Sequence, residues 1–145
     1  MEDKSNLKLL ANAFFDIRFF YHYGWEIVNV YDVFLAECII YRGKKLPKGF
    51  RGLEQMSMRY LNEVVSKEVR GQIHWRGLDD TVIRYAAGDV CKLNAIREKQ
   101  LLIINERNQW QYLRLENRYV LELAKMSYIG FKLNKEKWLE VERQN

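Results

Sequence analysis

Three side chains in this sequence combine reactive groups with apolar surroundings. Asp16 lies in the stretch Ala-Phe-Phe-Asp-Ile-Arg-Phe-Phe, whose aromatic residues predict a largely buried environment, and Asp89 follows Tyr85-Ala-Ala-Gly. Tyr85 and Asp89 are four residues apart, so a helix presents both on one face. Carboxylate oxygens are the ligands that Mg²⁺ and Mn²⁺ prefer, and acids from separate elements can hold such ions together. Each residue also has a structural explanation: Asp16 could cap a helix, Asp89 could be a solvated acid, and Tyr85 could pack in a core.

A basic stretch is the second feature with chemical potential. Residues 42–51 carry five cations, no acid, two glycines and the only proline of the chain, which predicts an exposed loop. Such a loop is either an ordinary solvated surface or a contact for phosphate groups. On the second interpretation Lys44 and Lys45, together with Arg70 and Arg76 farther along the chain, are candidates for contacts to a nucleic-acid backbone.

Composition and charge limit the class of protein. The chain has 145 residues, of which 48% are hydrophobic and 30% charged, and a net charge of +5; these values are typical of one folded domain with a mild preference for polyanions. No apolar run approaches the ~20 residues of a membrane span, and the acidic start does not resemble a secretory signal. Cys38 and Cys91 lack metal-ligand spacing, so we expect reduced thiols and a cytoplasmic protein without membrane contact.

The first half of the chain alternates strand and helix signals. Short apolar runs at 7–11 and 27–31 predict two strands, and helices are expected at 16–23 and 33–41, the second of them capped by Asp32. This order predicts an α/β fold with a parallel sheet covered by helices. Because two strands make a poor sheet, we expect the chain to be part of a larger α/β unit.

The second half is predicted to be helical. A short helix at 53–60 is followed by a glycine-bounded loop at 71–77, and further helices are expected from Asp80, over 112–128 and after Asn134, which would be the N-cap. The core-facing stripe of the long helix from Asp80 is predicted to consist of Val82, Ala86, Val90 and Leu93. Three further conspicuous side chains are expected to be structural: His22, His74 and Trp75.

The order and spacing of these residues resemble a known family. Asn12-x-x-x-Asp16, the helix after Asp32, and Tyr85-x-x-x-Asp89 are similar to the second and third motifs of the DEDD-type 3′–5′ exonucleases. The tyrosine variant of these motifs is the one found in the proofreading domain of family-A DNA polymerases. The resemblance extends from about residue 7 to the end of the chain. Its flanking features are residues 57–61, Lys67 with Trp75, and the segment 115–134.

The resemblance implies a ribonuclease H-like exonuclease fold and a set of residue roles. Asp16 and Asp89 would hold two divalent cations, Mg²⁺ or Mn²⁺, as the two-metal hydrolysis of a phosphodiester requires. The hydroxyl of Tyr85 would orient the attacking water, and Asn12 would contact the substrate or support the site. The implied substrate is the 3′ end of single-stranded DNA.

The sequence also departs from the family pattern. The first motif, Asp-x-Glu, supplies two further carboxylates and has no counterpart before Asn12, and the histidine that often precedes that asparagine is Ala11 here. We therefore expect an N-terminally truncated exonuclease domain over 1–128, followed over 129–145 by the start of a segment that leads toward a polymerase domain. With half of the ligands absent, the chain is expected to bind metal weakly, to hydrolyse little, and to have a missing N-terminal segment and an attached polymerase domain as partners.

Two alternatives remain open at this level. An RNA-trimming exonuclease would carry the same motifs, and discrimination at the 2′-hydroxyl depends on geometry that a sequence does not show. A degenerate module without catalysis, which binds single strands or serves as a structural spacer, would also fit a chain that lacks the first motif.

Overall fold

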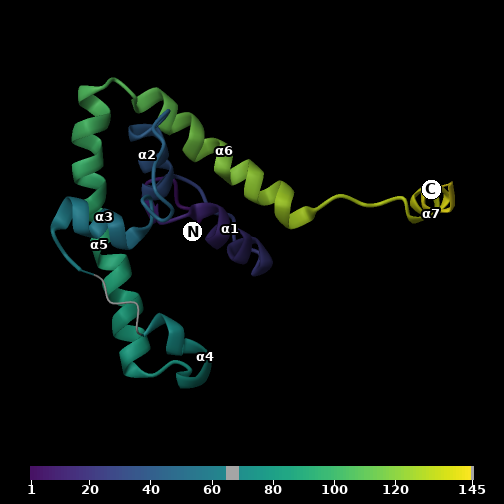
Figure 1. Cartoon of the computed structure of the whole chain (residues 1–145), viewed down its shortest axis with the longest axis horizontal. Helices are drawn as coiled ribbons and strands as arrows, with labels where there is room; N and C mark the ends of the chain where they lie inside the picture. The colour runs from purple at the N-terminus through teal and green to yellow at the C-terminus, as the bar shows by residue number, and fades with distance from the viewer. Residues whose placement is uncertain (65–68, 145) are drawn as a thin grey trace.

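The computed structural model describes residues 1–64 and 69–144 and is an α/β structure in which helices predominate (Figure 1). Its sheet has two parallel strands, β1 (Lys8–Leu10) and β2 (Val30–Asp32), paired from Lys8↔Val30 to Leu10↔Asp32. Helix α1 (Ala13–His22) lies between them in the chain. The predicted strand–helix order and the parallel pairing are confirmed, although both strands are shorter than the apolar runs that predicted them.

Asp32 determines how the chain turns at the carboxyl end of the sheet. Its Oδ1 accepts a hydrogen bond from the Phe34 N–H at 2.8 Å, which caps helix α2 (Val33–Ile40), and another from the Asn12 N–H at 2.9 Å. Its Oδ2 accepts the Ala13 N–H at 2.8 Å. The predicted cap of α2 is confirmed. The same carboxylate also satisfies the amides at the start of α1, which explains why that helix begins earlier than predicted.

Three short helical segments follow the basic loop: α3 (Leu53–Leu61), η1 (Arg70–Gln72) and α4 (Ile73–Arg76). The prediction of a loop at 71–77 is therefore wrong for most of that range. The prediction that Trp75 packs is also wrong, because its side chain is 82% exposed and its indole N–H donates to the Gly71 carbonyl one helical turn earlier, at 3.1 Å. Lys67, a flanking feature of the family resemblance, lies outside the described residues.

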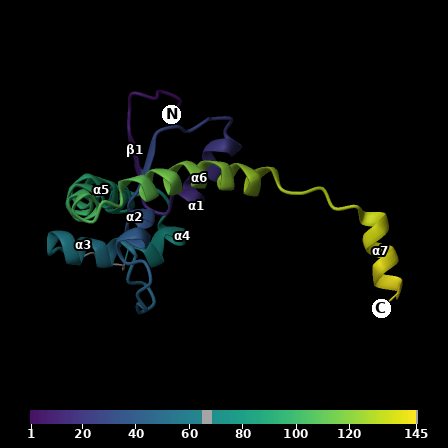
Figure 2. The same cartoon turned by 90° about the horizontal axis from the view of Figure 1, so that it is seen from above.

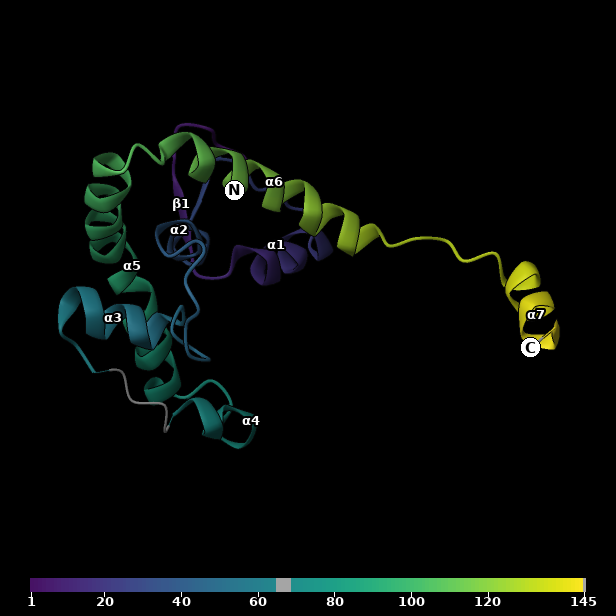
Figure 3. The same cartoon turned by 45° about the horizontal axis from the view of Figure 1, so that its top comes forward.

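Three longer helices complete the chain: α5 (Asp80–Glu106), α6 (Trp110–Ile129) and α7 (Lys135–Gln144). Helices α5 and α6 flank β1 and α2, and α7 lies apart at the end of an extended segment (Figure 3). The view from above places α5 and α7 at opposite ends of the molecule (Figure 2). The Asn134 side chain accepts the Lys137 N–H at 3.1 Å, which confirms the predicted N-cap of α7.

The buried stripe of α5 differs from the predicted one. Val82 and Leu93 are buried as predicted, but Ala86 and Val90 are exposed. The N-terminal half of α5 extends past α3 toward α4, so it has little against which to pack, whereas the C-terminal half contacts α2 and α3 (Figure 1). The buried positions accordingly continue along that half as Ile96, Gln100 and Ile104.

Two apolar clusters support the sheet from its two sides. The first joins β2, α2, α3, α5 and the start of α6, and includes Tyr31, Met56, Ile96 and Leu113. The second joins α1, β2 and α6, and includes Ile17, Ile27, Val120 and Ala124. The β2 neighbours Val30 and Tyr31 belong to different clusters, as residues on opposite faces of a strand should. In the part of the chain that the structure describes, no helix combines the length and the apolar character that crossing a bilayer requires, and Cys38 and Cys91 are free thiols.

Candidate functional site

A cleft of about 500 Å³ opens beside the carboxyl ends of the two strands. It is bounded by the residues that follow β1, the start of α2, the end of the basic loop, the first half of α3, the start of α4 and the N-terminal half of α5. Three of the residues singled out in the sequence, Asn12, Tyr85 and Asp89, line this one cleft. Segments that are distant in the sequence therefore meet at the edge of the sheet where ligands of α/β proteins commonly bind.

The local backbone geometry places Asn12 at this edge. Asn12 follows β1 closely and has a φ of 72°, in the left-handed region that asparagine tolerates better than most residues. Its N–H is held by the Asp32 carboxylate, so the turn from β1 into α1 is fixed from the neighbouring strand. The Asn12 side chain is left exposed and forms part of the cleft wall.

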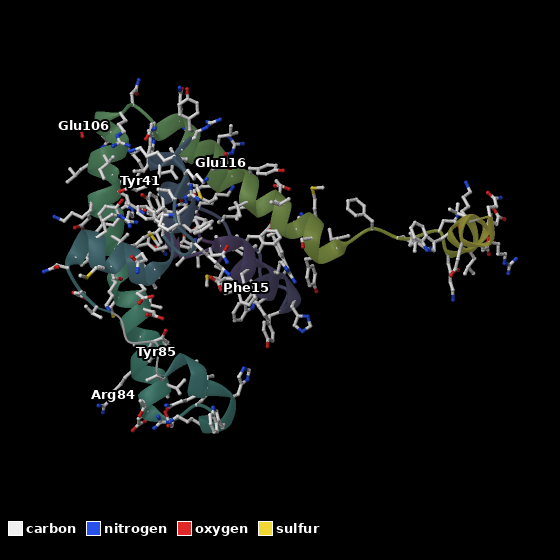
Figure 4. All side chains as sticks on the ribbon, in the orientation of Figure 1. Phe15, Tyr41, Arg84, Tyr85, Glu106 and Glu116 are labelled. Atoms are coloured by element: carbon white, nitrogen blue, oxygen red, sulfur yellow. The ribbon has the colours of Figure 1, made fainter. Side chains whose placement is uncertain are left out.

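Tyr85 and Asp89 approach the cleft from α5. Both lie on the half of α5 that extends past α3, and Figure 4 labels Tyr85 on this part of the helix. Because they are one helical turn apart, both contribute to the same wall of the cleft. Both side chains are half-buried, so a carboxylate and a phenol stand side by side with access to solvent.

Of the three predicted catalytic residues, Asp16 lies outside the cleft lining. It is half-buried in the first turn of α1, one turn beyond Asn12, and does not line the cleft. Burial raises the pKa of the Asp16 carboxyl, and the charge of nearby Asp32 raises it further. An acid in this position gains from a proton or from a cation that offsets the two negative charges.

The electrostatics of Asp32 follow from its structural role. Burial raises the pKa of this carboxyl, while hydrogen bonds from the backbone N–H groups of Ala13, Asn12 and Phe34 act in the opposite direction. The N–H donors stabilise the ionised form that caps two helices. Asp16 therefore sits beside an acid whose oxygens are already committed to the backbone.

The aromatic residues around Asp16 are not as buried as predicted. Phe15 and Phe19 are each more than half exposed, and their ring centroids lie 5.1 Å apart. Helix α1 buries Ala13 and Ile17 against its neighbours, so positions 15 and 19 fall on another face. An exposed pair of rings next to an acid offers a surface on which nucleic-acid bases can stack.

The basic candidates do not all lie at the cleft. Arg51, at the end of the basic loop, lines the cleft, whereas Lys44 and Lys45 are exposed and do not. Arg76 does not line it either, and its guanidinium is ion-paired at 2.9 Å with the N-cap residue of α5. The side chain of Arg70 lies outside the described part of the chain. Arg51 belongs to the basic stretch 42–51, for which phosphate contact was one of the two interpretations of the sequence.

A buried ion pair joins the elements around the cleft. Glu37 on α2 is fully buried, and its carboxylate accepts hydrogen bonds from the Arg59 guanidinium and the Tyr60 hydroxyl, both at 2.5 Å, and from the Gln100 amide at 3.0 Å. The guanidinium carbon of Arg59 also lies 4.0 Å from the centroid of the Phe50 ring. The cluster therefore links α2, α3, α5 and the end of the basic loop. The sequence patterns did not identify it, although an acid inside an apolar helix was the available signal.

The described residues do not complete a metal site. Across residues 1–64 and 69–144, no group of three or more His, Cys, Asp or Glu side chains is arranged to hold an ion. Mg²⁺ takes about six oxygen ligands in near-octahedral geometry. Asp16 and Asp89 would supply only part of the ligand set of two cations, so the residues present do not by themselves fit the two-cation site that the family resemblance implies.

Comparison with known proteins gives one assignment. A family model described as 3′–5′ exonuclease matches residues 1–104, which is more than two thirds of the chain and includes every residue that lines the cleft. No protein of curated function matches the chain. The match ends inside α5, so α6 and α7 lie beyond it.

Proposed function

Since the chain belongs to the 3′–5′ exonuclease family, we propose that residues 1–128 form a partial proofreading exonuclease domain with a ribonuclease H-like fold. Two parallel strands flanked by helices are compatible with that fold. Residues 129–145 are proposed to begin a segment that leads toward a polymerase domain. The separation of α7 from the remainder of the molecule supports this division (Figure 1).

One observation carries the proposal. Asn12 after β1, Arg51 before α3, and Tyr85 with Asp89 on α5 all line a single cleft at the carboxyl ends of the strands. A guanidinium and an amide can bind a phosphodiester, and a phenol and a carboxylate can position the water that attacks it. This combination of groups suits hydrolysis of a nucleic-acid end better than it suits a purely structural cleft.

Each group has a proposed role in removing a 3′-terminal nucleotide. Water adds to phosphorus as the bond from phosphorus to the 3′ oxygen of the preceding nucleotide breaks. The Tyr85 hydroxyl orients that water, while Asn12 and Arg51 hold the strand in the cleft. The exposed Phe15 and Phe19 rings provide a stacking surface for bases. Asp16 and Asp89 are proposed to supply part of a cation site that only a further segment would complete, and cations held there would neutralise charge on the phosphate.

The chain alone is proposed to hydrolyse slowly. The printed sequence contains no Asp-x-Glu motif, and the described residues include no cluster of three ligands. With two assigned carboxylates, affinity for Mg²⁺ or Mn²⁺ should be weak. A segment that brings Asp-x-Glu beside the cleft would supply the remaining ligands, and we propose such a segment as a partner of this chain.

A trimming assay tests the proposed function. The chain, and an extended chain that carries an added N-terminal strand with Asp-x-Glu from a family member, are each incubated with Mg²⁺ and a 5′-labelled single-stranded oligodeoxynucleotide. We expect stepwise shortening from the 3′ end by the extended chain and little by the chain alone. In the extended chain, Asp89→Ala and Asp16→Ala should each reduce the rate by at least about 100-fold.

The matched control is Glu106→Ala, which removes an exposed acid from the opposite end of α5 and should leave trimming unchanged. Trimming that survives both aspartate substitutions would show that these acids are not the ligands. Binding of the oligonucleotide without any trimming by the extended chain would instead favour a degenerate binding module. An RNA oligonucleotide shortened as fast as DNA would favour the RNA-trimming alternative.

A further inference from the structure

A second cavity lies at the end of the strands opposite to the cleft. It has a volume of about 470 Å³ and is bounded by Leu7 before β1, by Asn29 and Val30 at the start of β2, and by α5 and α6. Figure 3 shows β1 between these two helices. Because each strand has three residues, at about 3.3 Å per residue the two ends of the sheet are roughly 10 Å apart.

The charge of this cavity is strongly positive. Three arginines line it, and none of its lining residues is acidic. In the described part of the chain none of the three forms an ion pair. Guanidinium groups that stand together without an acid repel one another, and their planar forks match the oxygens of a phosphate group. These residues are Arg97 on α5 and Arg114 and Arg118 on α6.

A contact with the Tyr31 ring holds the Arg97 guanidinium at this cavity. Its guanidinium carbon lies 5.5 Å from the centroid of the Tyr31 ring, and the Tyr31 hydroxyl is anchored by a hydrogen bond to Gln100 at 3.2 Å. The Nε of Arg97 is buried and has no hydrogen-bond partner among the described residues. A cation–π contact fixes the position of the guanidinium without using its N–H groups.

Two further residues of the cavity have side chains that can contact a nucleic-acid base in addition to a phosphate. Trp110 begins α6, and its indole is 44% exposed. Asn117 is buried, and its Oδ1 accepts the Asp32 N–H at 3.0 Å. An aromatic face can stack with a base, and an amide N–H₂ can donate to a base or a phosphate.

We propose that this cavity binds a nucleotide, with its phosphate at Arg97, Arg114 and Arg118 and its base against Trp110. The nucleotide is either a free nucleoside phosphate or one nucleotide of a single strand, since the two share this chemistry. The cavity volume falls within the ~300–1,000 Å³ range of small-molecule sites. The proposal uses no cation and no residue of the cleft, so it does not rest on the nuclease assignment.

Fluorescence anisotropy with two probes tests the proposal on the full chain: fluorescently labelled dATP and a fluorescein-labelled single-stranded oligodeoxynucleotide. The double variant Arg114→Ala/Arg118→Ala removes two exposed cations and should weaken binding by at least about tenfold. The matched control, Lys125→Ala/Arg143→Ala, removes the same charge from exposed positions on α6 and α7 and should change affinity less than about twofold. Trp110→Leu should weaken dATP binding several-fold. The concentration of inorganic phosphate that displaces the labelled probe should stay the same.

The outcomes separate the two sources of the nucleotide. If the arginine variant binds only labelled dATP more weakly, the ligand is a free nucleoside phosphate. If it binds the strand more weakly, whether or not dATP binding also weakens, the ligand is a nucleotide within a strand. Unchanged binding in the arginine variant, or an equal loss in the control, overturns the proposal. Competition by polyglutamate as strong as that by dATP, combined with no effect of Trp110→Leu, also overturns it, because it marks a nonspecific surface for polyanions.

Discussion

Two carboxylates of this protein, Glu37 on α2 and Asp16 on α1, lie in opposite electrostatic settings. Glu37 is fully buried, but a guanidinium, a phenol and an amide all donate to it. Asp16 is only half-buried, yet the charge that acts on it is that of another acid, Asp32, which together with burial raises its pKa. The negative charge of Glu37 is therefore balanced by hydrogen-bond donors, whereas the charge of Asp16 is opposed by burial and by a neighbouring acid.

The difference indicates which acids deserve a functional assignment. A buried acid with a full set of donors is explained by the fold, because it joins several elements at one point. An acid that the fold leaves beside a second negative charge gains from a ligand that the protein alone does not supply. This contrast places Asp16, and not Glu37, among the candidates for a cation site.

The largest expected effect concerns the contribution of the Glu37–Arg59 ion pair to stability. Arg59→Ala leaves Glu37 buried without its counter-charge, so we expect the free energy of unfolding to fall by about 3 kcal/mol. Urea unfolding followed by circular dichroism measures this change. Arg59→Lys, which keeps the charge but loses the planar fork, should lose less. A loss below about 1 kcal/mol for Arg59→Ala would remove the contrast between the two acids.

The second effect concerns the contribution of Asp16 to the proposed activity. Asp16→Asn in the extended chain should lower the rate of 3′ trimming by at least about 100-fold, since the neutral amide is a poor ligand for Mg²⁺. Circular dichroism should show the same helical content as the parent chain. If trimming stays within about threefold of the parent, Asp16 has no role in the chemistry and its setting needs another explanation.

The third effect separates the role of the Tyr85 hydroxyl from that of its aromatic ring. Tyr85→Phe keeps the half-buried ring at the wall of the cleft and removes only the hydroxyl. We expect kcat for trimming by the extended chain to fall by about tenfold or more while KM for the oligonucleotide changes little, because the hydroxyl acts on the water and not on the strand. An increase in KM with kcat unchanged would contradict this role.

The smallest effect is a dependence of stability on pH. The folded-state pKa of Asp16 is raised above its usual value of 3.8, so its protonated form is favoured by folding, and this contribution is lost as pH rises through the folded-state pKa. Asp16→Asn should therefore be more stable than the parent at pH 7, by a few tenths of a kcal/mol after allowance for exposure, and no more stable at pH 3. Thermal melts at the two pH values measure the difference. A variant that is less stable at pH 7 would contradict the unfavourable setting of Asp16.

Local chemistry was sufficient to predict the features that depend on short stretches of sequence. The caps at Asp32 and Asn134 form as their side-chain types indicate, and the four-residue spacing of Tyr85 and Asp89 brings both to one wall of the cleft. The strand and helix order in the first half also followed from apolar runs and glycines, because these patterns act over a few residues.

Features that depend on which elements meet were not predicted. Val90 and Trp75 are apolar, but their parts of the chain extend past the core, so both are exposed. Phe15 is exposed because α1 packs through another face, and Asp16 lies a turn away from the cleft for a similar reason. The second cavity joins Arg97 and Trp110 only because α5 and α6 flank the same strands, which no local pattern encodes.

The central proposal is that Asp16 and Asp89 would share divalent cations once a segment with Asp-x-Glu completes the ligand set. Electron paramagnetic resonance of free Mn²⁺ measures the affinity for the ion directly. It is applied to the chain and to the extended chain, each as the parent, as Asp16→Asn, as Asp89→Asn and as the double variant. We expect each single substitution to weaken Mn²⁺ binding and the double variant to lose less than the two losses combined, as coupled ligands of one site should. Parent-like Mn²⁺ affinity in both single variants of the extended chain would contradict the claim.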